Sequence, residues 1–250
     1  MEEAILVNQV KKCYRLYLDK GKTLKERALF KKRRKYEERE VLKGISFSVL
    51  RGEAVGLIGQ NGCGKSTTLK LLARILYPDS GEIIVNGRVS SLIELGAGFH
   101  PDMTGRENIF INASIFGLTR KEIKQRMESI IDFSELGEYM DSPVRTYSTG
   151  MYMRLAFSVA IHVNAEVLLI DEILGVGDMY FQEKCFRKLQ EIKRNGTTIV
   201  IVSHSLEQIE EICEKSIWIQ EGEIAEIGLP KAVHTSYRNY MNQKNIRENS

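Results

Sequence analysis

The sequence has few of the features that mark secreted, zinc-binding or membrane-spanning proteins. Its four cysteines, Cys13, Cys63, Cys185 and Cys213, form no CxxC pair and have no histidine at a zinc-ligand spacing. We interpret them as reduced thiols: three of them fill space in the packing, and Cys63 is simply a small residue at its position. No apolar run approaches the roughly 20 residues that a membrane-spanning helix needs, and the acidic start of the chain does not resemble a signal peptide. We therefore expect a soluble, cytoplasmic chain.

The composition is that of an ordinary globular protein with one unusual segment. A chain of 250 residues with 43% hydrophobic residues suits one large α/β domain, or a domain with a small appendage. The net charge is only +3, yet the segment from Lys20 to Arg39 holds ten lysines and arginines against three glutamates. This basic segment is therefore attached to a mildly acidic body.

Apolar runs and turn signals predict alternating strands and helices. Capping boxes, Thr104 with Glu107 and Thr119 with Glu122, predict helices that begin near Gly105 and Arg120. The middle of the chain, about 100–165, should be mostly helical, and the chain after Tyr240, residues 241–250, should be a frayed polar tail. Strands are expected at 5–10, 41–49, 54–58, 82–85, 167–170, 198–202, 216–220 and 223–227, and further helices at 66–76, 152–163, 181–194 and after Ser205. This order predicts an α/β core with a helical insertion.

A glycine-rich loop lies between the expected strand 54–58 and the expected helix 66–76. It matches GxxxxGK[ST] without a gap, in the strand–loop–helix context that a phosphate-binding loop requires. Glycines let backbone N–H groups approach phosphates closely, and the helix N-terminus adds partial positive charge. We expect Lys65 to reach the β- and γ-phosphates of ATP and the Ser66 hydroxyl to ligate Mg²⁺. The predicted ATP-binding residues here are Gly59, Gln60, Asn61, Gly62, Cys63, Gly64, Lys65, Ser66 and Thr67.

Two carboxylates follow the apolar run 167–170. We expect Asp171 to hold Mg²⁺, directly or through water, and Glu172 to polarise the attacking water. A merely solvated acidic turn is the alternative, and the phosphate loop in the same chain disfavours it. His204 closes another apolar strand. A lone histidine there can be structural, but a strand beside that of Asp171 would bring it to the γ-phosphate.

A further segment completes a resemblance to the ATPases of ABC transporters. Tyr147-Ser148-Thr149-Gly150-Met151 resembles the family signature, usually written LSGGQ, and precedes an expected helix. The resemblance covers nearly the whole chain, residues 1–240. It implies an α/β fold of the ABC ATPase type: a P-loop NTPase core, an antiparallel β subdomain and a helical subdomain. In the family the signature faces the ATP of the opposing subunit. The resemblance therefore implies that Ser148 and the backbone at Gly150 contact a γ-phosphate across a dimer.

Several positions depart from the family pattern. The signature has Met151 where glutamine is usual, although Arg154 is kept. The D-loop position, which ends in Asp178, reads GVGD rather than the common SALD. The usual Q-loop glutamine is missing, and Glu94 is the candidate replacement. The family stacks adenine on an aromatic residue upstream of the phosphate loop; Tyr14 is the first choice here, with Tyr17 and Tyr36 as alternatives.

These departures are similar to one branch of the family. The segments ELGAGFHPDMTGRENI, YSTGMYMRLAFSVAI and DEILGVGDMYFQEKC, and an early YRLY followed by a basic insertion (18–40), resemble the ATP-binding subunits that export O-antigen, teichoic acid and capsule. The resemblance implies a homodimer that binds two MgATP and two copies of a transmembrane permease subunit. It further implies a lipid-linked polysaccharide as transported substrate, no nucleic acid, and a peripheral place on the cytoplasmic face of the cell membrane.

Two other functions compete with transport. A non-transport ABC ATPase acting on nucleic acid or ribosomes would use the basic segment, but the spacing from Lys65 to Asp171 leaves no room for a long coiled coil, and the chain has one ATP site. A scaffold that binds without hydrolysing conflicts with the presence of both Glu172 and His204. The basic segment itself is either a solvated loop or a helix that meets anionic headgroups at the membrane.

Overall fold

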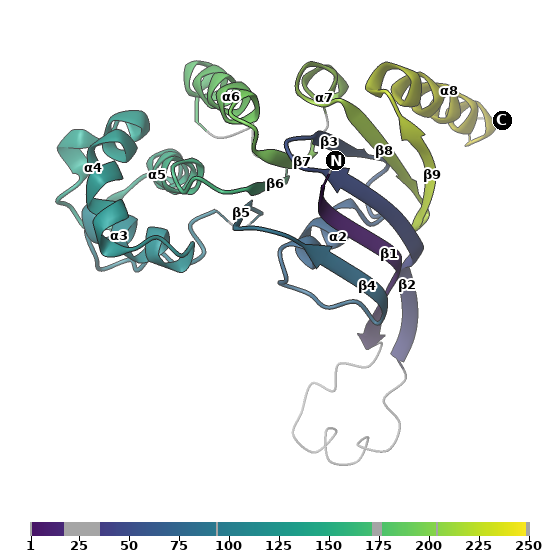
Figure 1. Cartoon of the computed structure of the whole chain (residues 1–250), viewed down its shortest axis with the longest axis horizontal. Coiled ribbons are helices and arrows are strands. Elements are labelled where there is room, and N and C mark those ends of the chain that lie inside the picture. Colours follow the sequence, from purple (N-terminus) through teal and green to yellow (C-terminus); the bar gives the residue numbers. More distant parts are fainter. Residues whose placement is uncertain (1, 18–35, 94, 172–176, 204, 249–250) are drawn as a thin grey trace, which may run out of the picture.

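The structure, a computed structural model, describes residues 2–17, 36–93, 95–171, 177–203 and 205–248. Within these residues the strands form a six-stranded sheet in the order β5-β6-β7-β3-β8-β9 and a three-stranded sheet in the order β2-β1-β4 (Figure 1). The strands are β1 (Glu3–Tyr17), β2 (Tyr36–Leu50), β3 (Ala54–Ile58), β4 (Ser80–Val85), β5 (Val89–Leu92), β6 (Val167–Asp171), β7 (Thr198–Val202), β8 (Lys215–Gln220) and β9 (Glu223–Gly228).

The larger sheet is parallel from β5 to β8, and β9 completes a hairpin with β8. Every residue of β3 and β7 is buried, which explains why both strands are continuous apolar runs rather than alternating ones. The carboxyl ends of these parallel strands lie at one edge, where ligands bind in open α/β sheets. The predicted hairpin at 216–227 and the strands at 54–58, 167–170 and 198–202 are all present.

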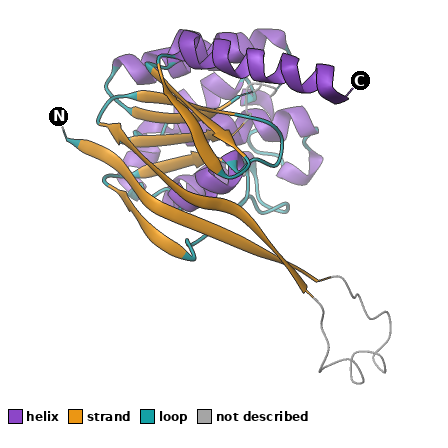
Figure 2. Cartoon of the chain, turned by 90° about the vertical axis from the view of Figure 1, so that its right-hand side faces the viewer, coloured by secondary structure: helices purple, strands orange, loops and turns teal. Residues whose placement is uncertain are grey.

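The smaller, antiparallel sheet is longer than the sequence predicted. We expected a short strand at 5–10, whereas β1 runs to Tyr17 and pairs with β2 along its whole length. Their far ends project beyond the other strands (Figure 2). The prediction fell short because residues 11–17 lack apolar alternation and are extended through pairing with β2, a contact that local sequence does not reveal.

The described helices are α2 (Lys65–Leu72), α3 (Gly105–Ile115), α4 (Arg120–Ser134), α5 (Thr149–Ile161), α6 (Met179–Arg194), α7 (Leu206–Ile212) and α8 (Pro230–Glu248). Short 3-10 turns cover Gly137–Tyr139 and Val144–Thr146. Both predicted capping boxes are formed, so α3 and α4 begin where expected. Helix α2 ends earlier than predicted, at Leu72, and Arg74 just beyond it has a φ of 58°.

Three cores hold the layers together. One fills the space between the two sheets around α2, with Ile5, Leu42 and Leu69 fully buried. A second lies between the other face of the parallel sheet and the helices α6, α7 and α8, which cover this face in Figure 1. The third belongs to α3, α4 and α5, which lie to one side of the sheets around Ile109 and Leu155. The predicted helical region therefore has its own apolar core.

The expectation of a frayed tail after Tyr240 is wrong for residues 241–248. They are the last turns of α8, which packs along β8 and β9. The tail looked polar because α8 buries only one side of its surface, so few apolar residues are needed to hold it.

No helix in the described part of the chain is both long and apolar enough to cross a membrane.

Candidate nucleotide-binding site

The glycine-rich loop joins the end of β3 to the start of α2. At Gly59, with φ +144°, an added Cβ would lie 2.1 Å from the carbonyl oxygen of Ile219, so only glycine fits. At Gly64, with φ +116°, a Cβ would lie 2.6 Å from Leu42 Cδ2. These two close approaches fix the loop between β8 and β2 and direct its backbone toward the N-terminus of α2.

Lys65 is the first residue of α2 and is 6% exposed. Its Nζ donates to the carbonyl oxygens of Gly59 at 2.8 Å and Gln60 at 3.0 Å, so the ammonium lies inside the curve of the loop. The partial positive charge of the helix N-terminus adds to the charge of the lysine. The loop therefore forms a small cationic cradle suited to an anion such as a phosphate.

Cys63, within the loop, is buried, and this burial raises the pKa of its thiol. The raised pKa disfavours the reactive thiolate, in line with the interpretation of Cys63 as simply a small residue of the loop.

Ser66 and Asp171 meet at the edge of the parallel sheet. The Ser66 hydroxyl donates to Asp171 Oδ1 at 3.4 Å, although the two residues come from α2 and from the end of β6. A hydroxyl and a carboxylate oxygen at this separation are a donor set that fits Mg²⁺, which prefers oxygen ligands and one or two carboxylates. The residue types and their convergence therefore fit the ion predicted from the sequence.

A cavity of ≈ 520 Å³ lies against the loop. Tyr14 lines it, together with Lys65 and Ser66, whereas Tyr36 does not line it and has Arg15 over its ring at 5.1 Å. The side chain of Tyr17 lies outside the described part of the chain. The sequence analysis missed Leu16, Arg39 and Val41 as lining residues. The β1–β2 register, which pairs Tyr14 with Arg39, brings them there.

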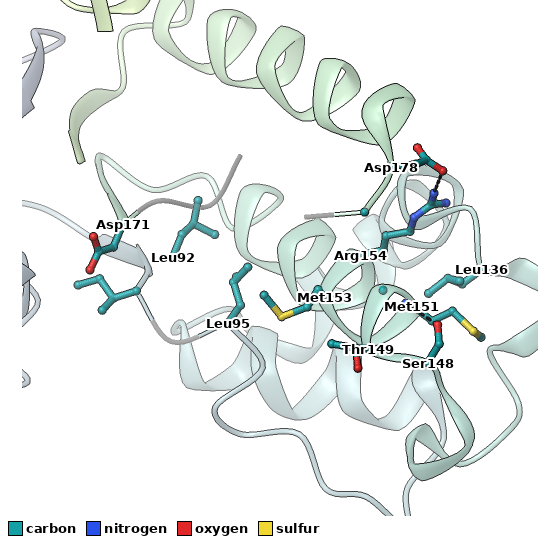
Figure 3. A pocket seen from close by; sticks show the side chains of 13 residues that line it. Leu92, Leu95, Leu136, Ser148, Thr149, Met151, Met153, Arg154, Asp171 and Asp178 are labelled. Atoms are coloured by element: carbon teal, nitrogen blue, oxygen red, sulfur yellow. Dashed lines mark hydrogen bonds and ion pairs between the residues drawn. The ribbon is translucent and has the colours of Figure 1, made fainter. Parts of the chain in front are cut away.

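The signature, residues 147–151, spans the start of α5 and lines a different cavity. Ser148 is the N-cap of α5 and accepts a hydrogen bond from the Met151 backbone N at 3.2 Å. Ser148, Thr149, Gly150 and Met151 line a cavity of ≈ 800 Å³ with Asp171 at its far side (Figure 3). Among the described residues, the lining of the cavity at the phosphate loop includes none of the signature.

Asp178 forms an ion pair with the signature helix, α5. It caps α6 by accepting from the Phe181 backbone N at 2.9 Å, and its Oδ2 lies 2.7 Å from Arg154 of α5, the pair joined by a dashed line in Figure 3. Arg154 also pairs with Glu135 at 3.2 Å and lies over the Phe181 ring at 4.7 Å. In the sequence Arg154 is recognisable only as a residue that matches the family pattern. Nothing in the sequence reveals that it links Glu135, after α4, to Asp178, before α6.

Three predicted residues, Glu94, Glu172 and His204, lie outside the described part of the chain, as do positions 175 and 176. The strands that precede two of them are described. β6 and β7 are adjacent and parallel, with Asp171 opposite Val202 in the register. This confirms the expectation that the strand before His204 lies beside the strand of Asp171.

The family model described as "ABC transporter" matches residues 42–175 of this chain. The chain belongs to the ABC transporter family. It is an ATP-binding member: it is 46% identical to the O-antigen export system ATP-binding protein RfbB of Klebsiella pneumoniae over 96% of this chain and 100% of that protein. This agrees with the phosphate loop, the sheet order and the position of Asp171, and it identifies the chain as an ATPase.

Other ABC proteins are also similar to this chain. A protein of the same name from Myxococcus xanthus is 49% identical over 94% of this chain, which spans 56% of that relative's length. The teichoic acids export ATP-binding protein TagH of Listeria innocua is 40% identical over 98% of this chain and 72% of its own. A dimeric ATP-binding cassette with bound ADP and Pi superposes with a TM-score of 0.72 at 20% identity, over 90% of this chain and 98% of that one. This confirms the predicted ABC ATPase fold.

Proposed function

We propose that this chain hydrolyses ATP to export a lipid-linked cell-surface polysaccharide of the O-antigen or teichoic-acid kind. The single structural observation that carries the ATPase chemistry is the convergence of Ser66 and Asp171 beside the cradle of Lys65. The names of the full-length relative and of the other export proteins support the class of substrate.

The nucleotide occupies the cavity at the phosphate loop in this proposal. Tyr14 stacks the adenine, because it lines this cavity with the loop, whereas Tyr36, the other candidate whose side chain the structure describes, does not. The backbone of Gly59–Ser66 and the Lys65 ammonium bind the β- and γ-phosphates. Arg39, on the strand opposite Tyr14, adds a second cation at the cavity wall.

Ser66 and Asp171 would hold Mg²⁺, which when bound neutralises charge on the phosphates. In this proposal Glu172 orients and polarises the attacking water, and His204 contacts the γ-phosphate. In the sequence both follow adjacent parallel strands, β6 and β7, whose carboxyl ends lie at the edge where Asp171 lies.

The active form in this proposal is a dimer. Within one chain the signature and the phosphate loop line two different cavities, so the signature is free to serve the nucleotide of a second chain. Ser148 at the positive end of α5 serves the nucleotide of the opposing subunit. Asp178, held by Arg154, lines the same cavity as the signature (Figure 3). ATP binding closes the dimer, and hydrolysis with phosphate release reopens it.

The dimer works as a peripheral subunit on the cytoplasmic face of the membrane, bound to two copies of a permease. The surface near residues 94–108 transmits force to the permease. Its residues 95–104 lie between β5 and α3, and residues 105–108 form the first turn of α3; Leu95 lines the same cavity as Leu92 and the signature.

The test is ATP hydrolysis by the chain co-purified with candidate membrane proteins. Wild-type protein should hydrolyse ATP faster when lipid-linked polysaccharide is supplied, and Lys65→Ala should abolish nucleotide binding. Stimulation by DNA or ribosomes with none by polysaccharide would overturn the transport assignment and leave the ATPase assignment in place. Unchanged nucleotide binding in Lys65→Ala would overturn the assignment of the loop.

A further inference from the structure

The C-terminal helix α8 reaches the phosphate loop, a contact that the sequence did not suggest. The helix runs beside β8 and β9 and ends at the C label in Figure 1. Residues at helical spacing, Val233, Tyr237, Met241 and Lys244, follow one side of it. Val233 is fully buried at one end of this side, and Met241 and Lys244 touch the loop at the other.

The first half of α8 is firmly anchored. His234 is fully buried and its ring nitrogens contact Glu210 Oε1 at 2.8 Å and Ser216 Oγ at 3.1 Å. The Trp218 ring on β8 packs against Tyr237 at 5.6 Å and Tyr240 at 5.4 Å between centroids. Because polar and aromatic contacts fix the helix axis over two turns, its next turn is held at a defined place over the loop.

That turn contacts both the nitrogen and the oxygen of the Gln60 side-chain amide. Gln60 Nε2 donates to Met241 Sδ at 3.0 Å, and Gln60 Oε1 accepts from Lys244 Nζ at 3.1 Å. An amide has one donor group and one acceptor group, and α8 supplies a partner to each. The Gln60 side chain is therefore fixed in rotation as well as in position.

The backbone of the same residue carries the central contacts of the loop. The Gln60 carbonyl oxygen accepts from Lys65 Nζ at 3.0 Å and from the Cys63 backbone N at 3.3 Å. A shift of Gln60 would therefore move the residue against which Lys65 rests and the turn that presents the loop N–H groups. Contacts run without interruption from α8, through Gln60, to the lysine of the cradle.

We propose that Met241 and Lys244 are positioning residues of the ATP site, and that α8 sets the affinity of the phosphate loop for nucleotide by holding Gln60. This inference rests on the proposed binding of ATP at Gly59–Ser66. It assigns a role in the site to the segment that the sequence presented as a tail. Helix α8 preorganises the loop, so that less order has to be gained when phosphate binds.

The effect expected from Lys244→Ala is a rise of about fivefold in the Kd for nucleotide, the size of one net hydrogen bond to a charged group at a partly exposed site. Met241→Leu, which keeps the packing volume and removes the sulfur acceptor, should raise it by less, on the order of twofold. KM for ATP should rise in both variants while kcat stays within about twofold of wild type, because neither residue touches the reacting atoms.

The experiment uses the full chain and measures binding of a fluorescent trinitrophenyl-ATP, ATPase kinetics and the melting temperature. Lys231→Ala is the matched control: it removes the same charge from an exposed site in the first turn of α8. Lys244→Arg, which retains a donor for Gln60, should restore much of the affinity. In a Gln60→Ala background, Lys244→Ala should have no further effect on Kd, because the residue through which it acts is gone.

Two outcomes would overturn the proposal: an unchanged Kd in Lys244→Ala, or an equal loss in Lys244→Ala with and without Gln60. The first of these outcomes, if accompanied by a lowered melting temperature, would assign α8 a purely structural role. Failure of the proposed function itself is distinguishable, since wild-type protein would then bind the nucleotide no better than Lys65→Ala.

Discussion

Replacing Arg154 with alanine tests whether the Asp178 loop is held by the signature helix. Arg154 lies on α5, is 19% exposed in its side chain, and pairs with Asp178 and Glu135 at 2.7 and 3.2 Å. Its guanidinium also lies 4.7 Å from the centre of the Phe181 ring on α6. The substitution removes all three contacts at once and leaves the Phe157–Phe181 ring contact between α5 and the start of α6.

The loss of stability in Arg154→Ala can be worked out from how exposed each partner of Arg154 is. The pair with half-buried Glu135 should contribute about 1 kcal/mol, the pair with the exposed Asp178 about 0.5 kcal/mol, and the cation–π contact about 0.5 kcal/mol. A total of about 2 kcal/mol lowers the melting temperature of a chain this size by about 4–8 °C. Thermal unfolding followed by circular dichroism measures it.

The loss of activity should be larger than this stability loss implies. Without Arg154, Asp178 keeps its cap on α6 but loses its link to α5, so the loop shifts relative to the signature. Misplacement on the order of 1 Å in a catalytic assembly can cost about 100-fold, and we expect ATPase activity to fall by at least about tenfold. The assay is steady-state phosphate release at a temperature well below both melting points.

Lys184→Ala is the matched control for this prediction. Lys184 also pairs with Glu135, at 2.7 Å, donates to the Phe133 carbonyl and lies 4.8 Å from an aromatic ring, but it does not touch Asp178. It should lower the melting temperature by a similar amount and leave ATPase activity within about twofold of wild type. Equal losses of activity in the two variants would refute the reasoning, because the Asp178 link would then carry no specific effect.

Three further predictions concern the site and the strand that positions it. Glu172→Gln should retain ATP binding and lose turnover, and activity within tenfold of wild type would remove Glu172 from the role of base. Ser148→Ala should cost about 1 kcal/mol as a lost N-cap, seen as a lower melting temperature, and should lower ATPase activity further than the cap alone explains; a proportionate loss would leave Ser148 only a capping role. The Cys13 backbone N–H and the Lys12 ammonium bind Asp79 and hold the pKa of its carboxyl below the usual value, so the stabilisation is present above about pH 4 and is lost as pH falls through the lowered pKa. Asp79→Asn should therefore show a shallower fall in unfolding free energy between about pH 5 and 3, and an unchanged slope would contradict this.

Local sequence patterns were sufficient to predict many of the helices and strands of this molecule. Both capping boxes, the buried strands and the strand–loop–helix context of Gly59–Ser66 are set by side chains within a few residues of each other. Backbone hydrogen bonding and the twofold or 3.6-residue periodicity depend on such neighbours, so sequence alone could predict them. The same locality made the loop recognisable as a phosphate site, since its glycines, lysine and serine are contiguous.

Contacts between distant segments were decided only by the tertiary structure. The extension of β1 to Tyr17 depends on its pairing with β2, and the helical end of α8 depends on Trp218 and on Gln60, 181 residues before Met241. The proposal that Tyr14 rather than Tyr36 stacks the adenine likewise rests on the β1–β2 register. The sequence by itself determined which residues we propose to bind phosphate and metal. The structure decided which helix supports the loop and which arginine holds Asp178, because those partners share no local pattern and meet only when the chain is folded.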